Sequence, residues 1–165
     1  MRESTTRPSP TRQAVGLAAF LGGVFLAAGL GSVFTATSVN TWYPALAKPP
    51  WTPPAWVFGP VWIVLYATMA LAAWLVWRRG LDAGRRALRW FAVQLALNVL
   101  WSAIFFGGRM PGLAIVDIVA LWLAIIVTGI TFWRISRAAG WLLVPYLFWV
   151  SFAAILNIAI WRLNA

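Results

Sequence analysis

The sequence predicts an all-α integral membrane protein, a bundle of five transmembrane helices with a lid formed by a loop rich in proline and tryptophan. The chain has 165 residues, of which 62% are apolar and only 10% charged, whereas a soluble domain carries about 25% charged residues. The apolar residues form five stretches, each close to the roughly 20 residues that cross a bilayer. The expected helices are 14–34, 55–77, 90–108, 111–133 and 138–161, within a single domain 14–165.

The first thirteen residues are polar and rich in Ser, Thr and Pro, with three arginines. We expect them to form a disordered basic tail. A basic segment before an apolar run can indicate a signal peptide, but the apolar core of a signal peptide has about 7 to 15 residues. The stretch 14–34 is longer and rich in small residues, so we predict a retained helix.

The basic residues are distributed unequally between the two sides of the predicted bundle. Five crossings place ten of the thirteen Arg and Lys residues on the side of the N-terminus, and leave Lys48, Arg109 and Arg162 on the other. Loops on the cytoplasmic side carry such an excess. We therefore expect a multi-pass protein of a bacterial cytoplasmic membrane with its N-terminus inside. The net charge of +10 is thus explained by orientation in a lipid bilayer, and no nucleic-acid partner is expected.

The composition excludes several kinds of chemistry. The chain has no cysteine and no histidine, which removes disulfides, thiol nucleophiles and the usual ligands of zinc and haem iron. Its acidic residues are Glu3, Asp82 and Asp117, too few for most mechanisms that need paired carboxylates. We expect no metal site and no required cofactor.

The loop between the first two helices combines stiffness with aromatic side chains. Residues 42–56 contain five prolines, three tryptophans and one tyrosine. Proline fixes φ and removes a backbone donor, so the segment cannot be one regular helix. Tryptophan and tyrosine also collect at the headgroup level of many membrane proteins, and such a belt is the alternative to a lid over a ligand.

Three later helices each carry aromatic and polar residues at helical spacing, so that the members of each stripe share a face. The stripes are Phe58, Trp62 and Tyr66; Gln94, Asn98, Trp101, Ser102 and Phe105; and Tyr146, Trp149, Ala153 and Asn157. Amides inside a membrane face the bundle because an unpaired amide in hydrocarbon is costly. Two interpretations stay open: a cavity for a flat, largely apolar ligand, or ordinary packing with amides joining the helices.

Two further features have alternative interpretations. Asp117 is the one acidic residue within a predicted span. It either bonds neighbouring helices or Arg109, or serves a ligand or a proton. Small residues recur every four positions from Ala19 to Gly31 and again at Ala103 and Gly107. Such stripes allow close helix contacts, either within the chain or, as a candidate for the second pair, in a homodimer.

The chain after its tail resembles the translocator protein family, also known as tryptophan-rich sensory proteins or peripheral-type benzodiazepine receptors. Several separated motifs, in the family's order, carry the resemblance. They are Trp42-Tyr43 through Lys48-Pro49, Trp51-Thr52-Pro53-Pro54, Pro60-Val61-Trp62 with Leu65-Tyr66, Gln94-Leu95-Ala96-Leu97-Asn98 with Trp101-Ser102, Val116-Asp117-Ile118 with Leu121-Trp122, Pro145-Tyr146 with Trp149, and Asn157.

The resemblance implies a five-helix bundle, often dimeric, that binds porphyrins such as protoporphyrin, and in some members haem or sterols, beneath the first loop. The implied walls are Tyr43, Pro53, Phe58, Trp62, Asn98, Ser102, Phe105, Trp149 and Ala153. Trp51 matches a loop position associated with ligand closure. Trp62 and Trp149 match tryptophans implicated in light-dependent porphyrin breakdown. The residue patterns add Asp117, Tyr146 and Asn157 as candidate ligand contacts.

Three functions are compatible with these features. The first is a membrane receptor or carrier for porphyrins and related hydrophobic ligands, which needs a pocket and little chemistry. The second is an enzyme that degrades porphyrin with light and oxygen, using Trp62 and Trp149 as redox participants. The third is a proton-coupled transporter that uses Asp117. We favour binding, with turnover as a side activity. Translocation is the weakest of the three, because five helices around one pocket show no inverted repeat of the kind that supports alternating access.

Overall fold

The computed structural model describes residues 9–165, apart from the side chains of residues 81–83; most of the expected disordered tail therefore lies outside the described residues. Within these described residues, five segments are long and apolar enough to cross a membrane, as the sequence predicts. The elements are α1 (Pro10–Ala36), the 3₁₀ turn η1 (Tyr43–Ala45), α2 (Ala55–Trp77), α3 (Leu81–Ser102), the π-helical segment η2 (Ala103–Gly107), α4 (Pro111–Ile135), α5 (Arg137–Leu142) and α6 (Val144–Asn164).

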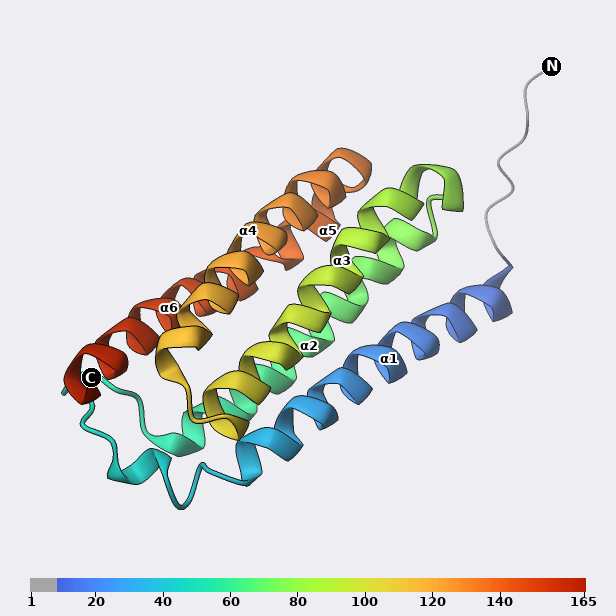
Figure 1. The fold of residues 1–165 in the computed structure, drawn as a ribbon. Coiled ribbons are helices and arrows are strands. Elements are labelled where there is room, and N and C mark those ends of the chain that lie inside the picture. The colour runs from blue at the N-terminus through green and yellow to red at the C-terminus, as the bar shows by residue number, and fades with distance from the viewer. Residues whose placement is uncertain (1–8) are drawn as a thin grey trace.

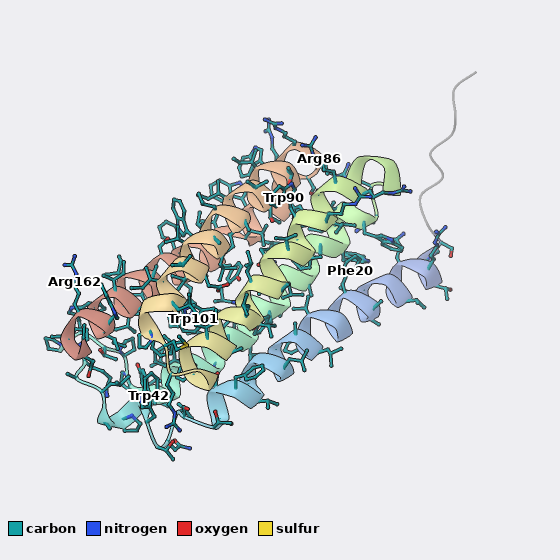
Figure 2. The ribbon with its side chains drawn as sticks, in the orientation of Figure 1. Phe20, Trp42, Arg86, Trp90, Trp101 and Arg162 are labelled. Atoms are coloured by element: carbon teal, nitrogen blue, oxygen red, sulfur yellow. The ribbon has the colours of Figure 1, made fainter. Side chains whose placement is uncertain are left out.

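The helices form one bundle in which α1 packs against α2 and α3, α3 against α4, α4 against α6, and α2 against α5 (Figure 1). The proline-rich loop, the junction between α3 and α4, and the C-terminus lie at one end, which we call the loop end (Figure 1). The α2–α3 and α4–α5 turns lie at the other, which we call the basic end. Figure 2 shows Arg86 at the basic end and Arg162 at the loop end.

Two helices begin earlier than predicted. Helix α1 begins at Pro10 rather than residue 14, because Ser9 Oγ accepts a hydrogen bond from the backbone N–H of Arg12 (3.4 Å) and caps the helix. The last residues of the expected tail are thus helical. Helix α3 begins at Leu81, nine residues before the predicted start. Its three arginines are exposed, and such side chains can reach water from a membrane edge, so they do not end the helix.

The last predicted helix is divided in two. Helix α5 ends at Leu142 and α6 begins at Val144. Pro145 supplies no backbone N–H, so the hydrogen-bond ladder is interrupted at this point. The backbone N–H of Leu143 instead donates to Gly140 O (3.1 Å). The chain reverses direction before α5, at Ser136, whose backbone is extended (φ −151°, ψ 113°), and α5 and α6 together form the last apolar span.

The small residues at the loop end pack within the chain. A Cβ at Gly31 would lie 3.4 Å from Ser102 Oγ, and a Cβ at Gly107 would lie 3.1 Å from the Phe34 ring. Gly107, expected as part of a dimer face, therefore serves the contact between η2 and α1. Gly23, by contrast, has no neighbour within 4 Å of an added Cβ. At the basic end, a Cβ at Gly16 would clash with the Trp77 ring, so α1 contacts the rest of the chain closely near both of its ends.

Candidate ligand-binding site

A cavity of about 670 Å³ lies within the bundle toward the loop end. Residues from α1, α2, α3, η2, α4 and α6 line it, together with Tyr43 and Val39 from the loop. Its aromatic lining consists of Phe25, Tyr43, Phe58, Trp62, Tyr66, Trp101, Phe105, Phe106 and Trp149. Its polar lining consists of Ser32, Thr35, Asn98, Ser102 and Asn157. The stripes of α2, α3 and α6, except for Gln94 and Tyr146, thus surround one space.

The structure brings nine of the thirteen candidate residues to this lining: Tyr43, Phe58, Trp62, Asn98, Ser102, Phe105, Trp149, Ala153 and Asn157. The other four lie outside it. Trp51 and Pro53 belong to the loop segment before α2, where the Trp51 ring contacts Phe152 (5.9 Å between centroids) and is 47% exposed. Tyr146 lies behind the wall that Trp62 forms. Asp117 is buried on α4.

The wall around Trp62 is held by a buried hydrogen-bonded group. The Tyr66 hydroxyl donates to Asn98 Oδ1 (2.7 Å), and Asn98 Nδ2 donates to the Tyr146 hydroxyl (3.1 Å). The Trp62 ring stacks on Tyr66 (5.3 Å) and meets Tyr146 edge-on (6.2 Å). Asn98 therefore joins three helices and lines the cavity at the same time. The two interpretations of the amide stripes, a ligand cavity and amides that join the helices, therefore both apply to Asn98.

A second amide fixes another part of the wall. Trp101 Nε1 donates to Asn157 Oδ1 (3.0 Å), and Asn157 Nδ2 donates to Pro111 O (2.9 Å). The Trp101 ring stacks on Phe105 (5.0 Å, 23° between planes). Figure 2 shows Trp101 among the helices near the loop end, with Trp42 in the loop below it. Satisfied indole and amide groups keep these rings in one orientation.

The segment η2 shapes the lining in a way that helical periodicity does not predict. The backbone N–H of Gly108 donates to Ala103 O (2.7 Å), a bond that spans five residues instead of four. The additional residue turns both Phe105 and Phe106 toward the cavity. π-helical turns are rare and frequently occur at functional sites. The sequence predicted an ordinary helix through residue 108.

Trp149 faces the cavity from α6. Its ring lies 5.8 Å from Phe58 and 5.6 Å from Phe152, measured between ring centroids. Trp62 and Trp149 thus border the same space from two helices. A flat ligand in this space could contact both indoles, and each aromatic pair contributes about 0.5–1.5 kcal/mol beyond the burial of area.

Lys48 folds the loop over this end of the bundle. Its Nζ donates to three backbone carbonyl oxygens: Tyr43 O (2.8 Å), Pro44 O (3.0 Å) and Leu46 O (2.8 Å). It also lies 5.0 Å from the centroid of the Tyr43 ring. Burial raises the pKa of the Tyr43 hydroxyl further above its ordinary value, so the hydroxyl keeps its proton and can donate a hydrogen bond.

Asn164 attaches the loop to the end of α6. Its Oδ1 accepts from the backbone N–H of Ala47 (3.0 Å), and its Nδ2 donates to Ala47 O (2.9 Å). On the other side, Ser38 Oγ donates to Phe106 O (2.7 Å). The loop is therefore fastened to both α6 and η2. Asn164 and Ser38 carried no signal in the sequence, because single polar residues near the ends of helices are common.

Asp117 does not line the cavity, and it is 7% exposed. Among the described residues, its Oδ2 has no hydrogen-bond partner. Arg109, an expected partner, donates from Nε to Ser38 Oγ (3.3 Å) instead. The described residues contain no cluster of three or more side chains that could hold a metal ion. The arrangement favours binding by stacking and shape over acid–base chemistry.

Comparison with known proteins places this geometry in a family. The model of the TspO/MBR family matches residues 17–162. The chain belongs to the TspO/MBR family. The match contains the loop and the whole cavity lining, so the bundle is that of a multi-pass membrane protein of this family.

Relatives in the TspO/MBR family come from distant organisms. The chain is 44% identical over 114 residues to the tryptophan-rich protein TspO of Archaeoglobus fulgidus, covering 69% of this chain and 74% of the relative. It is 41% identical over 115 residues to the human translocator protein, covering 68% of each. It is also 42% identical over 112 residues to the tryptophan-rich sensory protein of Cereibacter sphaeroides, covering 68% of this chain and 70% of the relative.

Proposed function

We propose that this protein is a membrane receptor or carrier that binds porphyrins, or similar flat apolar ligands, in the cavity beneath the loop. The observation that carries the proposal is the cavity itself. It has a volume of about 670 Å³, within the range of roughly 300–1,000 Å³ that is typical of small-molecule sites. Nine aromatic side chains and a few fixed polar groups line it. Such a lining suits a π-system with polar substituents at its edge.

The charges of the site constrain the pose of such a ligand. Among the described residues, no lysine or arginine lines the cavity, and an unpaired carboxylate is costly to bury. The propionates of protoporphyrin would therefore stay at the loop end, near water and the headgroups. Since the chain has no histidine or cysteine, binding would depend on stacking, and metal-free porphyrin should bind at least as well as haem.

A titration in the dark tests this function. Protoporphyrin is added to the purified protein and to Trp149→Phe, and the quenching of tryptophan emission is followed. Saturable quenching with a micromolar Kd, weakened by the substitution, supports the proposal. Linear quenching that is identical in both proteins would indicate partition into detergent and would contradict it.

Photo-oxidative breakdown of porphyrin is a second candidate function, because Trp62 and Trp149 both border the cavity. Under illumination in the presence of O₂, this function predicts loss of porphyrin absorbance that fails in Trp62→Phe and in Trp149→Phe. If both variants lost porphyrin absorbance as fast as the unmodified protein, these indoles would be excluded as redox participants. The proton-coupled transporter has no comparable support, because Asp117 lies outside the lining.

The membrane topology is also a proposal. We infer a bacterial cytoplasmic membrane with the basic end and the N-terminus inside, supported by ten basic residues against three. We also propose a homodimer as the working assembly. Since the chain has no cysteine, single substitutions Arg79→Cys and Arg109→Cys can be labelled in intact cells with an impermeant maleimide. Labelling of Arg109→Cys alone is expected. Labelling of Arg79→Cys alone would show the opposite topology, with the basic end outside.

A further inference from the structure

A second hollow lies at the basic end, away from the cavity. It has a volume of about 320 Å³ and lies between α4 and the α5–α6 segment. Its walls are almost entirely apolar, with Ile126 and Ile130 on one side and Val144 and Leu147 on the other. It shares no lining residue with the cavity under the loop. Ile130 is 49% exposed, so this groove opens on the surface that faces lipid.

Two glycines create the groove. A Cβ at Gly140 would lie 2.6 Å from the Trp133 ring and 3.0 Å from its Cα, so only glycine allows α5 to approach α4 this closely. A Cβ at Gly129 would meet nothing within 4 Å, so this position is an open depression on α4. The groove is therefore a gap between α4 and the α5–α6 segment, which are in close contact at Gly140 and Trp133.

The basic end of the groove carries a cation and two tryptophans. Arg134 belongs to the lining and is exposed. The rings of Trp133 and Trp141 meet edge-on (5.1 Å between centroids), and Trp141 is 62% exposed. Tryptophan at such a position is typical of the headgroup level. The distance from Ile125 to Arg134 is nine residues of helix, or roughly 13.5 Å, a length that an acyl chain can occupy.

The charge around Arg134 favours an anionic headgroup. Arg137 follows three residues later, and the acidic residue of the same helix, Asp117, is seventeen residues away, roughly 25 Å along the axis. We propose that this groove binds one acyl chain of an anionic phospholipid, with its phosphate at Arg134. The occupant would come from the leaflet at the basic end. An alternative role for Arg134, stabilising the C-terminus of α4, would require no groove.

Native mass spectrometry of the full-length protein in detergent tests this proposal. Equal concentrations of palmitoyl-oleoyl phosphatidylglycerol or phosphatidylcholine are added, and the retained lipid is counted. We expect phosphatidylglycerol to be retained at least about fivefold more strongly, since one basic residue contributes a factor of this size at a membrane surface. Arg134→Gln should abolish the preference. Arg162→Gln, which removes the same side chain from the loop end, should preserve it.

Two substitutions that fill the groove complete the test. Gly129→Leu should weaken phosphatidylglycerol retention about tenfold, because it displaces at least two methylenes of the acyl chain. Gly22→Leu, at another glycine with open space around it, should have no effect. Val144→Phe fills the groove from the opposite wall, in case Gly129→Leu lowers the thermal stability. Equal retention of the two lipids by the unmodified protein, or undiminished phosphatidylglycerol retention by both filled variants, would overturn the proposal.

Discussion

Lys48 offers the sharpest test of how the loop is held over the cavity. In Lys48→Met the apolar stem remains, but three carbonyl oxygens lose their shared donor. A hydrogen bond to a charged group contributes about 1.5–3 kcal/mol. Because the three bonds share one half-exposed ammonium group, we expect a total of about 2–4 kcal/mol rather than their sum. The opening equilibrium of the loop should rise roughly 30- to 1,000-fold.

Hydrogen–deuterium exchange measures this opening directly. The backbone N–H groups of Ala45, Leu46 and Ala47 are hydrogen-bonded in the closed loop, so the peptide that contains them should exchange faster in Lys48→Met. Peptides from α4 should be unchanged, and Arg162→Met should behave like the unmodified protein throughout. An increase below about threefold in the loop peptide, less than 1 kcal/mol, would refute the assigned role of Lys48.

Three further predictions concern the walls and the helix contacts. Asn98→Leu leaves two buried tyrosine hydroxyls without their partner and should destabilise the bundle by about 2–4 kcal/mol, measured by denaturation in mixed micelles; unchanged stability would show that the hydroxyls find other partners. Gly140→Ala places a Cβ against Trp133 and should lower the free energy of unfolding by about 1–3 kcal/mol in the same assay. An unchanged free energy would show that α5 can shift away from α4. Asp117→Asn should leave the Kd for protoporphyrin within about twofold, well under 1 kcal/mol, because the side chain is outside the lining; a larger change would place Asp117 in the site.

The number and placement of the helices could be predicted because each depends on local information. Apolar length fixes the five crossings, and the four-residue spacing of Phe58, Trp62 and Tyr66 fixes one face of α2. The starts of α1 and α3 could not be placed as well. Hydropathy detects the hydrocarbon core, whereas a helix continues into the headgroup region as long as its arginines reach water.

The parts of the site that escaped prediction depend on contacts between distant segments. Asn164 binds Ala47 across 117 positions of sequence, and no local pattern indicates such a pair. The π-helical turn at η2 is likewise set by packing, since its sequence suits an ordinary helix. The contribution of α1 to the lining, including Phe25 and Ser32, was not predicted, because small residues at four-residue spacing indicate a close helix contact and not a cavity. The small residues of α1 were the sequence feature that could have indicated its place beside the cavity.

The central claim is that the cavity beneath the loop is the porphyrin site, and a pair of glycines on α1 tests it most directly. Gly29 lines the cavity and Gly23 does not, yet a Cβ at either position meets nothing within 4 Å. Protoporphyrin titrations in the dark, followed by tryptophan quenching, should give a Kd about tenfold higher for Gly29→Leu, because the added side chain displaces about two methylenes' worth of ligand contact. Gly23→Leu should match the unmodified protein. Equal Kd values in all three proteins would contradict the account and place the ligand elsewhere.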